Sequence, residues 1–200
     1  EEFLKEQKQK TENSHLLEAI NNAQKALKNK GSFRYRYVGE NELTQEILEK
    51  KPKPKQIQNQ DDIESIKSIL DEDKTFTPEK PQTYIVDLKH DLYIGGYLNE
   101  HVEVAQGKDV LAAGEIKFEK TAQGWAITYI NQRSNGYYPH KNCFTDVKKS
   151  LAKTDIVFDK KEFDEVYPKN GYNDPDWLSI QIFGKNYNGK FKKKNRSIRL

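Results

Sequence analysis

The sequence predicts an α+β protein, with N-terminal helices followed by a mainly antiparallel sheet and a packed C-terminal helix. In the first part of the chain, apolar residues recur with the period of a helix. From residue 83 onward, short apolar runs alternate with polar residues and end at turn residues. Aromatic residues make up 11% of the 200 residues, so large side chains are available for a core although charged residues reach 32%.

Residues 1–60 are predicted to form a helical arm, a short strand and a linker. One stripe of the first helix is formed by four apolar residues, Leu16, Ile20, Ala23 and Leu27. Gly31 follows at the position of a helix C-cap. The run FRYRYV at 33–38 has a period of two, which indicates a half-buried strand with its aromatic side chains on one face. A second short helix, NELTQEILEK, then leads into 51–60, where two prolines indicate a linker.

Residues 61–200 are predicted to form one α+β domain with a basic C-terminal tail. Asp61 and Glu64 have the spacing of a capping box, which predicts a helix start. Two strand pairs follow: TYIVDL with LYIGGYL across KHD, and 109–119 with 124–131. A helix of about three turns then has one apolar face, formed by Phe144, Val147 and Leu151.

The positive charge of the chain is concentrated at its end. The segment 190–200 contains six basic residues and no acidic one, and without it the formal net charge of +3 becomes −3. Such a tail either docks on an anionic partner or is a solvated terminal run. Because the rest of the chain is mildly acidic, nucleic-acid binding through FRYRY and the tail is disfavoured.

Several classes of function are excluded by what the sequence lacks. It has no run of 18 apolar residues, so it contains no membrane-spanning helix. Cys143 is the single cysteine, which excludes an internal disulfide and a multi-cysteine zinc site and fits a reducing compartment such as the cytoplasm. We find no phosphate-binding glycine loop, Rossmann fingerprint or metal-ligand spacing, so no metal is predicted and the cofactor is left open.

The stretch INQRSNGYYPHKNCF, residues 130–144, is the least generic part of the chain. A turn and a helix entry explain Asn135, Gly136 and Pro139. They leave unexplained a set of polar and aromatic side chains, namely Asn131, Ser134, Tyr137, Tyr138 and His140. Because neighbouring residues in an extended chain point to opposite sides, one tyrosine is expected to pack while the other stays available to a ligand. His140 and Cys143 could form a base and nucleophile pair, or Cys143 simply packs as a small apolar residue.

Two residues of the preceding segment are further candidates. His101 follows a predicted strand, where it is either a base or ligand near neutral pH or an ordinary surface histidine. Glu115 interrupts an apolar strand after two alanines and a glycine. If its side chain points inward it must be paired or functional, and if it points outward it is unremarkable.

His101 and the two segments after it resemble a known module. The matching residues are His101, Gly107, Val110, Ala112, Ala113, Gly114, Glu115 and Ile116, then Ile130, Asn131, Ser134, Gly136, Tyr137, Tyr138 and Pro139. The pattern is similar to C-terminal modules of bacterial polymorphic-toxin and effector-like proteins, and to the domain beside the calmodulin-binding motif of plant IQ-motif proteins. It covers residues 83–153. The sequence departs from the pattern at Tyr137, where a histidine is often found.

The resemblance implies an effector or toxin-type domain. The sequence leaves the localisation open and favours a reducing compartment such as the cytoplasm, with secretion as an effector as one route to it. In this hypothesis His101, Glu115 and Tyr138 are catalytic, and Asn131, Ser134, Tyr137 and His140 bind a small nucleotide-like ligand, with ADP-ribosyl transfer as an analogy. The alternative is a non-enzymatic module that docks a protein partner through its aromatic face and basic tail. The sequence indicates neither a cofactor nor an oligomeric state.

Overall fold

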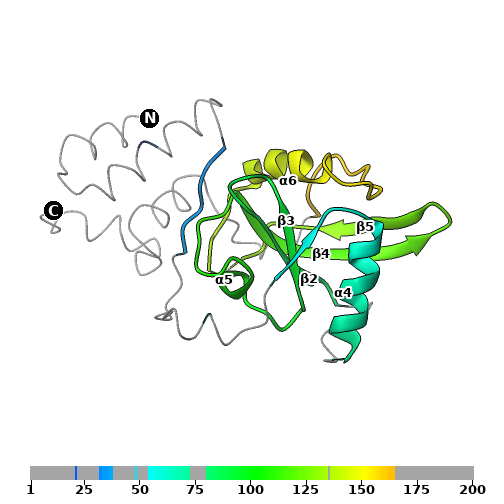
Figure 1. Cartoon of the computed structure of the whole chain (residues 1–200). Helices are drawn as coiled ribbons and strands as arrows, with labels where there is room; N and C mark the ends of the chain where they lie inside the picture. The colour runs from blue at the N-terminus through cyan, green and yellow to red at the C-terminus, as the bar shows by residue number, and fades with distance from the viewer. Residues whose placement is uncertain are drawn as a thin grey trace, which may run out of the picture.

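The computed structural model describes residues 21, 32–37, 48, 54–72, 80–134 and 136–164. Apart from Asn21 and Leu48, the predicted N-terminal helices lie outside these residues, as does the basic tail 190–200. The described part is an α+β fold built on one antiparallel sheet of five strands in the order β1-β3-β2-β4-β5 (Figure 1). No helix in this part is long and apolar enough to cross a membrane.

The elements follow one another with short connections. The strands are β1 (Lys55–Ile57), β2 (Gln82–Val86), β3 (Leu92–Gly95), β4 (Ala112–Thr121) and β5 (Gly124–Ile130). The helices are α4 (Gln60–Glu72), α5 (His101–Val104) and α6 (Phe144–Leu151), and the short 3-10 helix η1 (Lys141–Cys143) precedes α6. The two predicted hairpins, β2–β3 and β4–β5, are confirmed.

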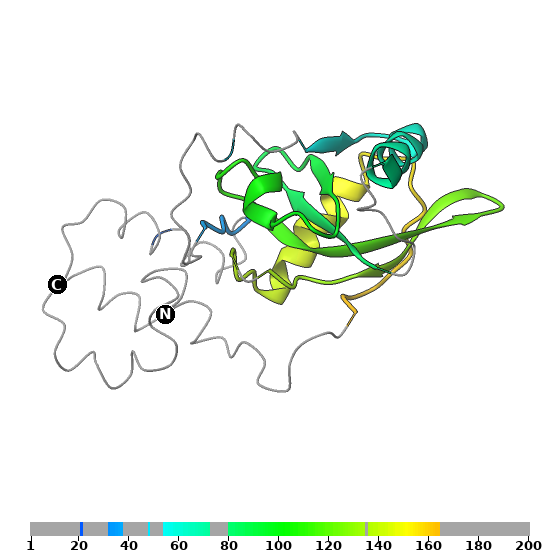
Figure 2. The ribbon, with the colours of Figure 1, turned by 90° about the horizontal axis from the view of Figure 1, so that it is seen from below.

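Helices α5 and α6 lie on opposite faces of the sheet (Figures 1 and 2). Helix α6 packs on β2, β3 and β4, and α5 packs on β2 and β3. The predicted apolar face of α6 is confirmed, because Phe144, Val147 and Leu151 are all buried. Ile116 and Ile130 pair across β4 and β5 and are 0% exposed, and burial of each contributes about 2 kcal/mol. The long β4–β5 hairpin extends beyond the rest of the sheet.

The start of α4 differs from the prediction. The helix begins at Gln60, and its reciprocal cap is made by Asn59 and Asp62 rather than by Asp61 and Glu64. Asp62 N–H donates to Asn59 Oδ1, and Asn59 N–H donates to Asp62 Oδ2, both at 3.1 Å. Asn59 has the side chain of a good N-cap, and the cap that it forms lies two residues before the predicted one.

The segment 32–37 is extended but joins the sheet only through a bridge between Tyr35 and Val110. The predicted inward aromatic face is confirmed, because Phe33 and Tyr35 are buried while Arg34 is exposed. The aromatic side chains of this segment therefore belong to the core, and they do not form an external docking face.

The outer edge of β5 is covered by side chains and by a short stretch of backbone outside the strands. The side-chain amide of Gln60 bonds both the N–H and the C=O of Trp125. Val157 pairs with the strand through Ile127 N–H at 3.1 Å, and Asp164 Oδ2 accepts from Ile130 N–H at 2.6 Å. Since an open strand edge is a template for pairing with other chains, these contacts close this edge.

Candidate functional site

Asn131, the first residue after β5, uses every polar atom of its side chain. Its Nδ2 donates to Glu115 Oε2 at 2.9 Å and to Tyr129 Oη at 2.7 Å. Its Oδ1 accepts from the backbone N–H of Glu115 at 3.0 Å and of Arg133 at 2.8 Å. Because an amide has two N–H hydrogens and two acceptor lone pairs, this side chain is fully satisfied and held in one orientation. We refer to Asn131, Glu115 and Tyr129 as the Asn131 cluster.

The backbone of Asn131 lies directly against β4, and this contact requires a glycine there. A Cβ atom at Gly114 would stand 2.0 Å from the carbonyl oxygen of Asn131. The same carbonyl accepts a hydrogen bond of 2.8 Å from Tyr84 Oη, and Tyr84 is the register partner of Gly114. The glycine of AAGEI therefore allows a close approach of two backbones, which brings Asn131 within reach of Glu115.

His101, the first residue of α5, contacts the same strand segment. Its Nε2 lies 2.9 Å from the carbonyl oxygen of Gly114. A carbonyl only accepts, so Nε2 carries the hydrogen. Burial lowers the pKa of His101 to about 4, although the hydrogen bond with Gly114 acts in the opposite direction. His101 is therefore neutral at physiological pH and acts on the site by holding the Gly114–Glu115 peptide, which makes it a positioning residue.

The Asn131 cluster is buried at its centre and accessible at its ends. Asn131 is 1% exposed, whereas Glu115 and Tyr129 are partly exposed. Burial raises the pKa of the Tyr129 phenol. The hydrogen bond from Asn131 opposes the rise, the carboxylates of Glu115 and Asp164 add to it, and Arg133 opposes it. Tyr129 thus stays a neutral phenol, with a carboxylate and a guanidinium in its surroundings.

Ser134 and Tyr137 are structural. Ser134 is buried, and its hydroxyl accepts from Tyr137 N–H at 3.3 Å while its carbonyl accepts from Tyr138 N–H at 2.9 Å. Tyr137 is 0% exposed and donates its hydroxyl to the carbonyl oxygen of Lys108 at 2.7 Å, and burial raises its pKa. The expectation that one tyrosine of the pair packs is confirmed, since Tyr138 is partly exposed. The expected ligand-binding role of Ser134 and Tyr137 does not agree with their burial in the turn.

His140 and Cys143 also serve the entry into α6. His140 is buried, and its Nδ1 accepts from Asn142 N–H at 3.2 Å, which caps η1. Cys143 is buried, and this burial raises the pKa of its thiol well above the usual value. Because the thiol is protonated and His140 is used in the cap, His140 and Cys143 do not form an activated nucleophile pair.

Tyr138 has a φ of 49°, an uncommon conformation for a bulky residue.

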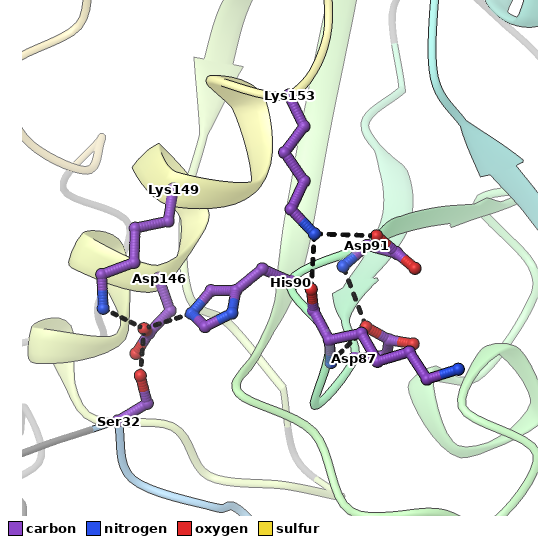
Figure 3. Close-up of polar contacts among 8 residues, drawn as sticks. Ser32, Asp87, His90, Asp91, Asp146, Lys149 and Lys153 are labelled. Carbon is purple, nitrogen blue, oxygen red and sulfur yellow. Dashed lines mark hydrogen bonds and ion pairs between the residues drawn. The ribbon is translucent and has the colours of Figure 1, made fainter.

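A second polar cluster, missed by the sequence analysis, is centred on Asp146. Figure 3 shows Ser32, His90 and Lys149 converging on its carboxylate. Asp146 Oδ1 accepts from the Ser32 hydroxyl, lies 3.0 Å from His90 Nε2 and lies 3.1 Å from Lys149 Nζ. Ser, His and Asp are all present, but in a catalytic triad the imidazole stands between the other two. Here Ser32 and His90 both bind the same carboxylate oxygen, so the cluster joins three distant segments of the chain.

The backbone of His90 has an unusual conformation. His90 lies in the β2–β3 turn with a φ of 63°, and its N–H donates to the carbonyl of Asp87 at 3.0 Å. A positive φ is uncommon for residues other than glycine. Next to His90, Lys153 Nζ pairs with Asp91 at 3.0 Å (Figure 3). The turn is therefore attached to α6 through Asp146 and to the residues just after α6 through Lys153.

Tyr129 and Arg133 are the members of the Asn131 environment that sequence reasoning missed. A signal was present, because Tyr129 and Asn131 are two residues apart at the end of a strand and so lie on the same side of it. Glu115, the third member, was identified. The direction of Arg133 depends on the turn after the strand, which has no regular period.

No group of His, Cys, Asp and Glu side chains among the described residues is arranged to hold a metal ion. Comparisons with protein-family models, with curated proteins and with solved structures find no match to this chain.

Proposed function

We propose that the Asn131 cluster binds a small, nucleotide-like ligand through the hydroxyl groups of its sugar. The observation that supports this proposal is the division of the two Nδ2 hydrogens of Asn131, one to Glu115 Oε2 and one to Tyr129 Oη. One buried amide thereby holds a carboxylate and a phenol at a partly exposed position, with no freedom to reorient. Such pre-organisation lowers the entropy cost of ligand binding.

The two groups have complementary hydrogen-bonding capacity. Glu115 accepts from Asn131 through Oε2, so its other oxygen is available to accept from a sugar hydroxyl. Tyr129 Oη accepts from Asn131, and its own hydrogen has no acceptor among the residues that the structure describes. It can therefore donate to a ligand oxygen. A neighbouring pair of hydroxyls, as on ribose, can satisfy both residues at once.

The finer proposal is that Glu115 acts in ADP-ribosyl-transfer-like chemistry of an effector or toxin. A carboxylate beside a sugar stabilises the positive charge that develops on its ring when a glycosidic bond breaks. His101 and Asn131 would position Glu115, and Tyr138 would contribute from the turn that follows β5. Ser134, Tyr137 and His140 would support that turn.

Titration calorimetry with ADP-ribose and with NAD tests the proposal. We expect Glu115→Gln to weaken binding of ADP-ribose at least about tenfold, because a charged acceptor is lost. Its fold should persist, since a glutamine oxygen still accepts from Asn131. The matched control is Glu119→Gln, an exposed residue of the same strand. Absence of ADP-ribose binding to the unmodified protein would overturn the proposal, and release of nicotinamide from NAD that depends on Glu115 would support the transfer reaction.

The alternative is a protein-binding module that uses an aromatic face and the basic tail. The burial of Phe33 and Tyr35 removes the aromatic face from this alternative. What remains is the tail, 190–200, which lies outside the described residues. Deletion of 190–200 should weaken capture of an anionic partner in a salt-dependent manner, and an unchanged affinity would reject the alternative.

A further inference from the structure

We infer that Arg133 binds an anionic group of the ligand, so that the site prefers a sugar phosphate to a neutral sugar. This inference rests on the proposed function and adds to it the chemical class of the ligand. Three features of Arg133 support it: the way its backbone is held, the lack of a partner for its side chain, and its position relative to Tyr129.

The backbone of Arg133 is held by the same amide that holds the other two groups. Its N–H donates to Asn131 Oδ1 at 2.8 Å, and this oxygen also accepts from the N–H of Glu115. A single buried side chain thus fixes the starting point of a carboxylate, a phenol and a guanidinium. The four hydrogen bonds of Asn131 therefore place the backbone of Arg133 next to the carboxylate and the phenol.

The guanidinium of Arg133 has no hydrogen bond and no ion pair within the described part of the chain, and the residue is exposed. The neighbouring cations are engaged differently. Lys160 Nζ pairs with Asp164 at 2.9 Å, and Lys117 Nζ lies 5.7 Å from the centre of the Tyr129 ring. Arg133 is therefore the cation of this region whose five donors are open to a ligand.

Arg133 and Tyr129 are bound to the same side chain, since the N–H of Arg133 donates to Asn131 Oδ1 and Tyr129 Oη accepts from Asn131 Nδ2, and the positive charge of Arg133 accordingly lowers the pKa of that phenol. A ligand that contacts Tyr129 and Glu115 through its hydroxyls can then place an attached anion near Arg133. A planar guanidinium binds a phosphate through two parallel hydrogen bonds, which a lysine cannot reproduce. A neutral sugar gains nothing from this residue.

The test compares AMP with adenosine, which share the base and the ribose and differ by one phosphate. Binding is measured by calorimetry at low salt for the unmodified protein, Arg133→Gln and Arg133→Lys. We expect AMP to bind about tenfold more tightly than adenosine, and this ratio to fall to about one in Arg133→Gln with adenosine affinity unchanged. Arg133→Lys should keep part of the preference. Lys141→Gln removes the same charge from an exposed residue of η1 and should keep the full preference.

The outcomes separate the two proposals. If adenosine binds in a Glu115-dependent manner but AMP has no advantage, or keeps its advantage in Arg133→Gln, the inference on Arg133 is overturned and the proposed function stands. If neither compound binds the unmodified protein, both fail. Inorganic phosphate is titrated alone as a third probe, and binding as tight as that of AMP would show a free-phosphate site and overturn the sugar phosphate.

Discussion

Two polar clusters, each organised by one buried side chain, differ in where the charged group lies. In the Asn131 cluster the central side chain is neutral, and its hydrogen bonds hold Glu115 and Tyr129 at a partly exposed position. In the Asp146 cluster the central side chain is itself the charge. Ser32, His90 and Lys149 direct their donors inward onto it. The first arrangement leaves binding capacity on its outer members, whereas the second consumes it.

This difference explains why a set of catalytic residue types is a poor guide by itself. The Asp146 cluster contains serine, histidine, aspartate and lysine, yet all of the donors meet one carboxylate oxygen. The Asn131 cluster contains only one charged member, but that carboxylate is held by a satisfied partner and keeps an oxygen for a ligand. The direction of the hydrogen bonds, and which groups they leave unused, separates a structural connection from a candidate site.

The largest effect is expected from breaking the backbone contact beneath the Asn131 cluster. Gly114→Ala places a Cβ atom 2.0 Å from the carbonyl oxygen of Asn131, and backbone cannot move aside as a side chain can. We expect a loss of more than about 3 kcal/mol in the free energy of unfolding, measured by urea denaturation. In the matched variant Gly95→Ala the added Cβ meets side-chain atoms of Val104 and Asn99, so a smaller loss is expected. Equal losses would show that the close approach to Asn131 is not special.

The next effect is a pH dependence that arises from His101. Its pKa is about 4 in the folded protein and about 6.5 in an unfolded chain, so between these values the unfolded state binds a proton that the folded state does not. Stability should therefore fall as the pH decreases, by about 2 kcal/mol between pH 7.5 and pH 5. His101→Gln cannot take up this proton but can still donate to Gly114. If the variant shows the same loss on acidification in urea denaturation, another group is responsible.

A smaller effect is expected from the Asp146 cluster. Asp146→Asn removes a buried charge whose partners Lys149 and His90 are partly exposed and can be rehydrated. We expect a loss of about 2 kcal/mol in unfolding free energy, with ligand affinity at the Asn131 cluster unchanged. Asp155→Asn, at an exposed position, is the control. A loss of ADP-ribose binding in Asp146→Asn without loss of stability would mean that the two clusters are coupled and that the contrast between them is wrong.

Much of the fold could be predicted from the sequence because its signals are local. The two hairpins and the apolar face of α6 follow from periods of two and of three to four residues, and these are confirmed. The start of α4 was misplaced because the reciprocal cap is made by Asn59 and Asp62, a pair that the prediction did not use. The strand predicted at 33–38 is a single bridge, since pairing depends on a partner that comes much later in the chain.

Only some residues of the candidate site could be predicted from the sequence. Glu115 and Asn131 were identified as candidates, and the structure brings them together. His101 was also identified, but its burial and its bond to Gly114 change it from an acid–base candidate to a positioning residue. Tyr129 and Arg133 were missed, because their roles depend on hydrogen bonds made across two strands and a turn.

The sequence by itself determined the α+β class and the hairpins, because these depend on spacing and on backbone geometry near each residue. The tertiary structure alone decided which polar side chains form hydrogen bonds within the protein and which keep donors or acceptors for a ligand. In the folded protein Ser134, Tyr137 and His140 stabilise the chain between β5 and α6. Ser32 and His90 both contact Asp146. The physical reason is that a buried polar group must find a partner, and that partner is usually far away in the chain.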